Sequence, residues 1–346
     1  MPASRTSIAD LARALNLAAS TVSRALAHSP DVSEATQQRV QQLASELRYQ
    51  PNQLAVALRK GSSNTVGVLV PHITGSFFPE VVDGIIETAS KASYHIIVCP
   101  SHEDTRQEKK NVELLVAEQV AGFLVSVASS TREVSHFEAL QTSGVPLVFF
   151  DRAAVGFAGN HVSSVVIDDY AGAYAVVAHL LAEGCRRIAH FSGPLHVGSY
   201  QQRHQGYCQA LRDYGVPYQE ELVYLAEPHH QAAGAAGMRQ MLALPQPPDA
   251  VFSADDILTA GAMLTLKHLG LRIPADVALA GFSNAPFTLL TEPPLTTVDQ
   301  CSHQMGCLAM QQLLQLLRPS SKHGPPAPVL LTPKLVVRAS SQRALT

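Results

Sequence analysis

Short apolar runs alternate with helical stretches throughout residues 64–346, and this rhythm restricts the fold more than any other feature. Runs rich in Val, Ile and Phe favour strands buried on both faces, and their alternation with helices predicts parallel sheets covered on both sides. Two successive series of runs predict two α/β lobes. The runs are VGVLV (66–70), HIIVC (95–99), GFLVSV (122–127) and LVFFD (147–151), then VVID (165–168), RIAHF (187–191), LVYL (222–225), DAVFS (249–253) and VALAG (277–281).

Residues 1–48 carry a helical pattern instead. Ser7 and Asp10 form a capping-box signature for a first helix, a second helix follows NLAA, and Ser33 is placed to cap a third. These helices predict a small trihelical unit. The apolar residues expected to pack it are Ile8, Leu11, Ala12, Leu15, Val22, Leu26, Val40, Leu43 and Leu47.

The second helix leaves a polar face made of Ser20, Thr21, Ser23 and Arg24. Arg can donate two hydrogen bonds to guanine, and Ser and Thr can contact bases or phosphates. The pattern is typical of a helix-turn-helix whose second helix enters the major groove. An ordinary helical hairpin with a polar outer face is the alternative.

Charge is distributed unevenly along the chain. Residues 1–63 contain seven Lys or Arg and four Asp or Glu, a net charge of +3, whereas the remainder carries −6. A basic head on an acidic body indicates an anionic partner for the head alone.

The segment YQPNQLAVALRK (49–60) reads as a helix of about two turns that a proline opens and Gly61 ends. Helices shorter than roughly 12–15 residues are marginal in water. Leu54 and Leu58 nevertheless present apolar bulk on one face. The segment is therefore either a flexible linker or a helix that folds only against a partner.

The remaining features are mainly absences. The five cysteines have no CxxC pair, which favours reduced thiols. No signal core is present, and no apolar run approaches the roughly 18–20 residues of a membrane span, so we expect a cytoplasmic protein without a membrane partner. No phosphate-loop, dinucleotide, zincin or hydrolase-elbow motif occurs, so we expect no cofactor. His229 and His230 are adjacent, which does not suit a helical metal pair, and we expect no metal.

Read as a whole, the chain resembles the lactose-repressor (LacI/GalR) family of bacterial transcription regulators. The resemblance covers essentially the whole sequence in order. It rests on TVSRAL, DVSEATQQRV and YQPNQLAVALRKG in the head, and on VGVLVP, GFLV, VPLVFFDR, GCRRIAHFSGP, RHQGY, ADDILTAGAM, DVALAGFSN and PPLTTVDQ beyond it.

The resemblance implies a domain plan. A helix-turn-helix head spans 1–49, a hinge helix 50–63, and an effector-binding and dimerisation body 64–346. The body should have the type I periplasmic-binding-protein architecture, with lobes at about 64–163 plus 295–328 and about 164–294 plus 329–340. The three crossings between lobes are thus expected near 163, 294 and 328.

For the head, the resemblance implies that the hinge folds when two subunits meet on operator DNA and that Leu58 wedges between base pairs in the minor groove. Ala18 stands where the family usually has a capping Ser, a loss of about 1 kcal/mol, and Ala27 replaces a usual Asn. The expected DNA contacts are Thr6, Ala19, Ser20, Thr21, Ser23, Arg24, Tyr49, Asn52, Gln53, Ala55 and Leu58.

For the body, ligands of open α/β sheets bind beyond the carboxyl ends of the strands. Asp255 stands where the family often has Asn, and Ser283 replaces an Asp of many sugar- and purine-responsive members. Phe77 and Phe78 have core packing as their alternative. The expected effector contacts are Phe77, Phe78, Asp151, Ser199, Arg203, Asp255, Ser283 and Gln300, with Arg203 as the main one.

The expected function is a transcription regulator, a repressor, that binds double-stranded operator DNA as a homodimer and responds to a sugar-like effector, with phosphorylated sugars included. Two rival functions use the same lobes. One is a solute-binding receptor, which the basic head disfavours. The other is a sugar-modifying enzyme in which Asp151, Asp255 and Asp256 serve acid–base chemistry.

Leu58→Ala tests the hinge. Removing the wedge should weaken specific operator binding while leaving the affinity of a cleft ligand nearly intact. Electrophoretic mobility and DNA-bending assays measure the first, and ligand titration the second. Unchanged operator affinity and bending would contradict the hinge interpretation.

Overall fold

The computed structural model describes residues 6–47, 49, 63–154, 156–157, 159–226, 230–318 and 325–343. The chain divides into two compact units between residues 63 and 64, which we call the head and the body. Hinge residues 50–62, including Leu54 and Leu58, lie outside the described residues.

Three helices form the head: α1 (Ile8–Leu15), α2 (Ala19–Leu26) and α3 (Glu34–Glu46). The capping box at α1 is confirmed, because the Asp10 N–H donates to Ser7 Oγ and the Ser7 N–H donates to the Asp10 carboxylate. Ser33 stands at the start of α3, but its hydroxyl pairs with that of Thr36 and does not cap the helix.

The head's core follows the predicted helical spacing, with Leu11, Val22 and Val40 fully buried. Leu47 is the exception, with 43% of its surface exposed, because α3 ends before it and it leaves the buried stripe. The Tyr49 side chain instead packs against this core.

The first lobe of the body is built on a parallel sheet in the order β11-β5-β4-β3-β1-β2. Along β1, Val66, Val68 and Val70 face a core shared with α5 and α12, and Leu69 faces α6 and α7. This alternation covers both faces of the sheet. The elements are β1 (Thr65–Val70), β2 (His95–Pro100), β3 (Phe123–Val125), β4 (Leu147–Phe150), β5 (Val162–Ile167), β11 (Val329–Leu331), α5 (Phe77–Lys91), α6 (Thr105–Ala117), α7 (Ser135–Thr142) and α12 (Ser302–Leu316).

The second lobe has a parallel sheet in the order β7-β6-β8-β9. Helices α8 and α9 cover one face, and α10 and α11 cover the other. Its elements are β6 (Ile188–Ser192), β7 (Val223–Leu225), β8 (Ala250–Ser253), β9 (Ala278–Ala280), α8 (Asp169–Ala182), α9 (Gly198–Asp213), α10 (Gln231–Leu242), α11 (Asp256–His268), and the 3-10 turns η1 (Glu220–Leu222) and η2 (Pro286–Leu289).

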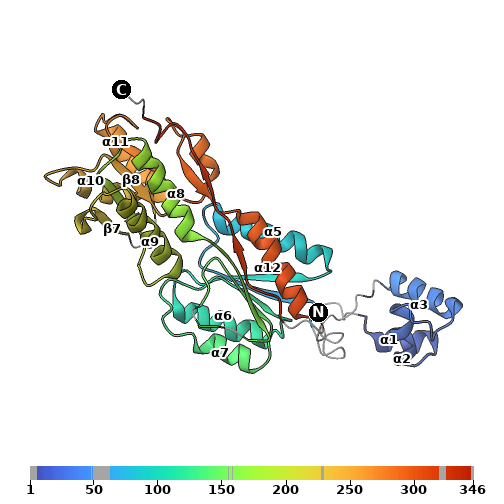
Figure 1. Ribbon diagram of the computed structural model, residues 1–346. Helices are drawn as coiled ribbons and strands as arrows, with labels where there is room; N and C mark the ends of the chain where they lie inside the picture. The colour runs from blue at the N-terminus through green and yellow to red at the C-terminus, as the bar shows by residue number, and fades with distance from the viewer. Residues whose placement is uncertain are drawn as a thin grey trace. The chain divides into compact units, whose positions relative to one another are not determined.

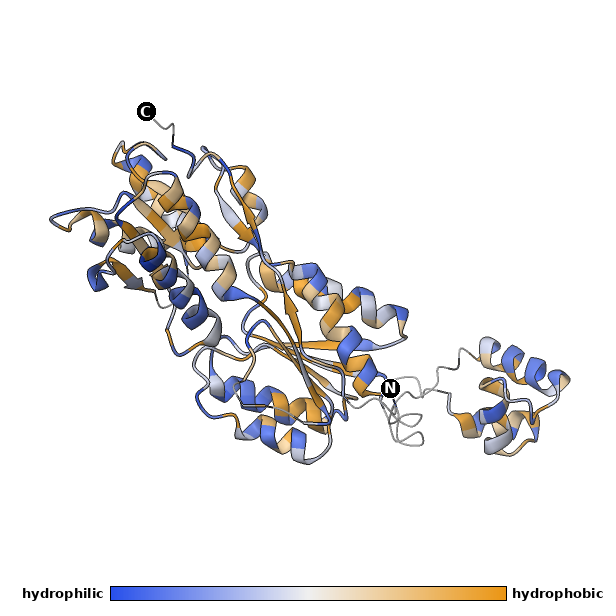
Figure 2. Cartoon of the chain, viewed as in Figure 1, coloured by the Kyte–Doolittle hydropathy of each residue, from blue (hydrophilic) through white to orange (hydrophobic). Residues whose placement is uncertain are grey.

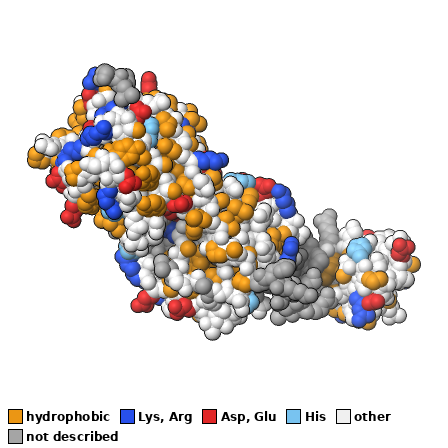
Figure 3. All heavy atoms as spheres, viewed as in Figure 1, with side chains coloured by type: hydrophobic (Ala, Val, Ile, Leu, Met, Phe, Trp, Pro, Cys, Tyr) orange, Lys and Arg blue, Asp and Glu red, His pale blue; other side chains and the backbone are white. Residues whose placement is uncertain are grey.

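Parallel sheets between helices agree with the predicted fold class, and every predicted apolar run contains a strand. Figure 2 shows the strands in the colour of hydrophobic residues, with more hydrophilic helix faces turned outward. On the face drawn in Figure 3, charged side chains lie mainly toward the rim of the body. The sequence did not predict the antiparallel pair of β10 (Thr297–Asp299) and β12 (Lys334–Val336).

The three crossings between lobes lie later than expected. Strand β5 continues the first sheet through Ile167, so the first crossing is at 168 and not near 163. Val298 of β10 belongs to the second lobe's core, which places the second crossing at 300–301 and not near 294. Strand β11 pairs with β5 through Leu331, which moves the third from 328 to 332–333.

Helices α5 and α12 lie side by side in the first lobe (Figure 1) and touch through glycines. A Cβ at Gly306 would lie 1.9 Å from the Val81 carbonyl oxygen, and a Cβ at Gly84 would lie 2.2 Å from the His303 carbonyl oxygen. Only glycine allows this backbone approach.

Gly306→Ala should therefore lower the free energy of unfolding of the body by about 1–3 kcal/mol, the usual range for overpacking. Gly198→Ala is the matched control, because a Cβ at Gly198 would meet nothing within 4 Å, and it should shift stability by less than about 1 kcal/mol. Chemical denaturation measures both. Equal effects of the two substitutions would contradict the close-packed seam.

No helix within the described ranges is long and apolar enough to cross a membrane.

Candidate functional site

A cavity of about 730 Å³ lies between the two lobes of the body. Its walls come from the carboxyl ends of strands and the turns that follow them, as expected for open α/β sheets. The first lobe contributes segments after β1, β2 and β4, and the second contributes segments after β8 and β9 together with the start of α9.

All eight residues predicted as effector contacts line this cavity. The residues on its wall are Phe77, Phe78, Asp151, Ser199, Arg203, Asp255, Ser283 and Gln300. Phe78 also belongs to the first lobe's core and Phe77 packs against it, so the core-packing interpretation applies to this pair, whereas contact with an effector stays a prediction.

Several non-glycine residues around the cavity have a left-handed backbone, which costs of order 1–3 kcal/mol each. They occupy the turns after four different strands. They are His102, Glu103, Asp151, Asn284 and Cys301, with φ between 53° and 59°.

Arg203 is buried and bonded on every side. Its Nε donates to Asp169 at 2.8 Å, one terminal nitrogen donates to the Ala254 carbonyl at 2.6 Å, and the other donates to Gln300 Oε1 at 3.0 Å. Its guanidinium carbon lies 3.8 Å from the centre of the Phe282 ring. Every nitrogen of the residue expected as the main effector contact thus already has a protein acceptor.

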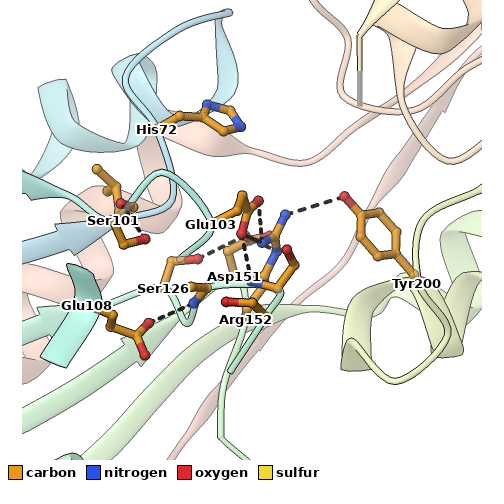
Figure 4. A network of polar contacts seen from close by, with 12 residues as sticks. His72, Ser101, Glu103, Glu108, Ser126, Asp151, Arg152 and Tyr200 are labelled. Atoms are coloured by element: carbon orange, nitrogen blue, oxygen red, sulfur yellow. Dashed lines mark hydrogen bonds and ion pairs between the residues drawn. The ribbon is translucent and has the colours of Figure 1, made fainter. Parts of the chain in front are cut away.

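Arg152 forms a second network, which joins the lobes (Figure 4). One terminal nitrogen donates to both Glu103 carboxylate oxygens at 2.9 and 3.0 Å, and the other donates to the Tyr200 hydroxyl at 3.3 Å. Burial opposes ionisation of Glu103, but Arg152 and the Ser129 N–H hold its pKa below the usual value. A second contact between lobes joins the His196 ring to the Ser129 carbonyl at 2.6 Å.

Two other carboxyl groups on the cavity wall accept fewer hydrogen bonds than Glu103 does. Asp151 accepts from the Ser126 hydroxyl at 3.2 Å, and the nearest Arg152 nitrogen is 3.8 Å away. Asp255 caps α11 by accepting from the Ile257 N–H at 2.6 Å. Burial raises the pKa of both groups, against the fields of nearby arginines.

Sequence reasoning missed Glu103, Arg152 and Tyr200. The strand-end rule could have found Glu103, which follows β2, and Arg152, which directly follows Asp151. Tyr200 had no such signal, because its role depends on how the two lobes face each other.

In the head, Ala19, Ser20 and Arg24 are exposed on α2, and Thr21 and Ser23 are partly exposed. No side chain caps α2, which begins after Ala18 as expected. The Thr6 hydroxyl donates to the Leu47 carbonyl at 3.2 Å, and the Tyr49 ring packs inward. Four expected DNA contacts lie outside the described residues: Asn52, Gln53, Ala55 and Leu58.

Within the described part of the chain, one group of side chains has the spacing of metal ligands: Glu87, His303 and Cys307. Glu87 and His303 are exposed, and Glu87 already pairs with Lys91 and His303. We assign no metal there. His230 caps α10 through its ring nitrogen, and His229 lies outside the described residues.

Comparison with known proteins identifies a known family model in both the head and the body. Residues 7–52 match the model of bacterial regulatory proteins of the lacI family, and residues 177–341 match that of the periplasmic binding protein-like domain. The transcriptional repressor CytR of Escherichia coli K12 is 32% identical over 333 residues, 96% of this chain and 95% of CytR. The chain belongs to the LacI family.

Other relatives agree. The ribose operon repressor of Halalkalibacterium halodurans is 30% identical over 90% of each chain. The crystal structure of the lac repressor dimer bound to operator and the anti-inducer ONPF matches with a TM-score of 0.84 at 25% identity, covering 98% of this chain and 100% of that one. The CelR–cellobiose complex matches with a TM-score of 0.73 at 28% identity, covering 97% and 100%.

This LacI-family chain is therefore a DNA-binding transcription regulator and not an enzyme, since its relatives are repressors. The carboxyls considered for acid–base chemistry have structural partners as well. Asp256 accepts from the Ala285 N–H at 2.8 Å and from the Thr297 hydroxyl at 2.7 Å.

Two buried carboxyls make the stability of this LacI-family body depend on pH. Burial raises the pKa of Asp256 to about 7, against the bonds from Ala285 and Thr297. Burial raises the pKa of Asp169 to about 6, against Arg203. Because both folded-state values exceed the ordinary 3.8, the folded chain binds more protons than the unfolded chain between those values. The contribution of these groups to stability is present at low pH and is lost as pH rises toward 7.

Asp256→Asn should flatten this dependence, because Asn keeps an acceptor oxygen and has no charge to bury. The measurement is the melting temperature at a series of pH values between 4 and 8, which covers the interval between the ordinary and the raised pKa of Asp256. Glu118→Gln, at an exposed site, is the control and should leave the slope unchanged. An unchanged slope in Asp256→Asn would show that another group controls it.

Proposed function

We propose that the protein is a repressor whose affinity for operator DNA is set by a small effector, a sugar or sugar derivative, bound in the cavity between the lobes. The observation that carries the proposal is the pairing of two units in one chain. One presents an exposed polar helix, and the other encloses a cavity lined from both lobes.

The head supports the DNA part of the proposal. Arg24 projects from α2 beside Ser20, and both side chains are exposed in a unit whose sequence carries an excess of positive charge. Ala19 and Ser20 are too small to make more than a methyl contact or one hydrogen bond. Arg24 and contacts to phosphates should therefore supply much of the affinity.

The body supports the effector part. The cavity joins an aromatic wall, Phe77 and Phe78, to polar groups that can bind hydroxyls, and it has the size typical of small-molecule sites. CelR is known in complex with cellobiose, which favours a sugar. A ligand that contacts both lobes stabilises some arrangements of the lobes more than others. Allosteric control requires such a difference.

We also propose that the regulator acts as a homodimer on a near-palindromic site, because a two-fold protein reads two-fold DNA. The body exposes an apolar patch in which Ile73 and Ile86 are 57% and 44% exposed. Ile73, Pro79, Val82, Ile86, Val98 and Pro100 line this patch, which suits a second copy of the chain. Since operators lie on the chromosome, we place the protein in the cytoplasm.

Arg24→Ala tests the function. The wild-type protein first selects its sites from a random duplex library. Arg24→Ala should then weaken binding to the selected site by about 1–3 kcal/mol and relax its sequence preference, measured by fluorescence anisotropy across a range of salt concentrations.

Arg39→Ala, on the exposed side of α3, removes the same charge and should have a much smaller effect. Failure of the wild-type protein to select any duplex, or binding that does not weaken with salt, would overturn the DNA-binding proposal.

A further inference from the structure

The cavity contains more carboxyl groups than cationic groups that could neutralise them. Its wall includes the carboxyls of Glu103, Asp151, Asp255 and Asp256, and the guanidinium groups of Arg152 and Arg203. His72, His102 and His230 also line it, the last two at exposed positions.

Both guanidinium groups are already paired. Arg152 holds Glu103 through two hydrogen bonds, and Arg203 forms a buried ion pair with Asp169 at 2.7 Å. Each guanidinium charge is therefore already balanced by a carboxylate, and a ligand anion that contacted either arginine would share that cation with the carboxylate.

After this pairing, Asp151 and Asp255 remain as acceptors. Asp151 has the Ser126 hydroxyl as its hydrogen-bond donor, and Asp255 has the Ile257 N–H. A carboxylate can accept about four hydrogen bonds, so both retain capacity toward the cavity. Ser283, where many family members have an Asp, accepts from the Gln300 amide at 2.8 Å and adds no charge.

The charge balance opposes an anionic ligand and favours a donor-rich one. A phosphate or carboxylate in the cavity would lie beside the carboxyl groups of Asp151 and Asp255, and like charges repel. Hydroxyl, N–H or amino groups would instead satisfy the open acceptors, and hydrogen bonds to a charged acceptor are the stronger kind. The aromatic wall suits the flat or apolar face of a ring.

We propose, resting on the proposed function, that the effector is an unphosphorylated ring compound rich in O–H or N–H donors, uncharged or bearing an amino group, and that Asp151 and Asp255 select it over phosphorylated sugars and sugar acids. On the described wall of the cavity, two features would thus determine which ligand binds. One is the pair of acceptors, Asp151 and Asp255, and the other is the pairing of both arginines with protein carboxylates.

Matched ligand pairs test the proposal on the full-length protein. Thermal shift and calorimetry compare sugars with their phosphates, nucleosides with nucleotides, and amino sugars with sugar acids, at one ionic strength and neutral pH. A neutral or amino member should bind about tenfold or more tightly than its anionic counterpart. Tighter binding of any anionic member in the cavity would overturn the proposal.

Asp255→Asn keeps the helix cap but removes the charge. The substitution should lower the affinity for the neutral or amino ligand by about tenfold, and it should reduce the preference for that ligand over its anionic counterpart. Asp213→Asn, at an exposed site on α9, removes the same charge and should change neither quantity. An unchanged preference in Asp255→Asn would contradict the role of this carboxylate.

Inorganic phosphate provides a probe that needs no identified effector. Compared with chloride at equal ionic strength, it should give no saturable stabilisation of the wild-type body. Saturable stabilisation that Arg203→Lys or Arg152→Lys reduces would reveal a usable cation in the cavity and overturn the proposal.

The two proposals fail differently. If a neutral ligand binds but leaves operator affinity unchanged, the effector function fails while the charge selection stands. If an anionic ligand binds and changes operator affinity, the effector function stands while the charge selection fails.

Discussion

The buried ion pair between Arg203 and Asp169 holds together the segments of the body where the chain crosses between the lobes. Asp169 begins α8 directly after the first crossing, and Gln300, the second partner of Arg203, lies on the second crossing. The same guanidinium also holds the end of β8 through Ala254 and stacks on Phe282. Removing one member of such a pair typically costs about 3–5 kcal/mol. Arg203 therefore holds the crossings in position beside the cavity.

One contact between the lobes away from the crossings, from Arg152 to Tyr200, is long and involves only one charged group. The Arg152–Tyr200 bond is 3.3 Å long, and Arg152 keeps its main partner, Glu103, in its own lobe. Breaking the contact with Tyr200 would leave the Arg152 charge neutralised. Under the proposed function, a ligand that takes the place of that hydroxyl would alter lobe placement without leaving a buried charge unpaired, so a modest binding energy would suffice to shift the populations.

The sequence predicted the sheets and cavity wall well, since both depend on local patterns. Continuous apolar runs identified the parallel strands β1 to β9 but not β11, and the strand-end rule identified Asp151 and Asp255. It did not predict β10 and β12, because each contains a charged residue, Asp299 or Lys334, and forms no continuous apolar run. The first crossing was misplaced because VVID, counted with the second series of runs, belongs to β5 of the first sheet. The other two were misplaced because β10 and β11 were not predicted. The sequence did not predict Tyr200 for a different reason. A contact between the lobes depends on how the lobes pack and not on the residues next to Tyr200 in the sequence.

Backbone strain explains why the cavity can have a defined charge pattern before a ligand arrives. Glu103 and Asp151 both adopt left-handed backbones, with φ of 59° and 57°. Such conformations persist only when the surrounding fold determines them. In this geometry one terminal nitrogen of Arg152 donates to both carboxylate oxygens of Glu103, whereas Asp151 lies 3.8 Å from the Arg152 Nε. Two turns that follow β2 and β4 of the same parallel sheet thus share the Arg152 charge unequally, and this leaves Asp151 with acceptor capacity toward the cavity.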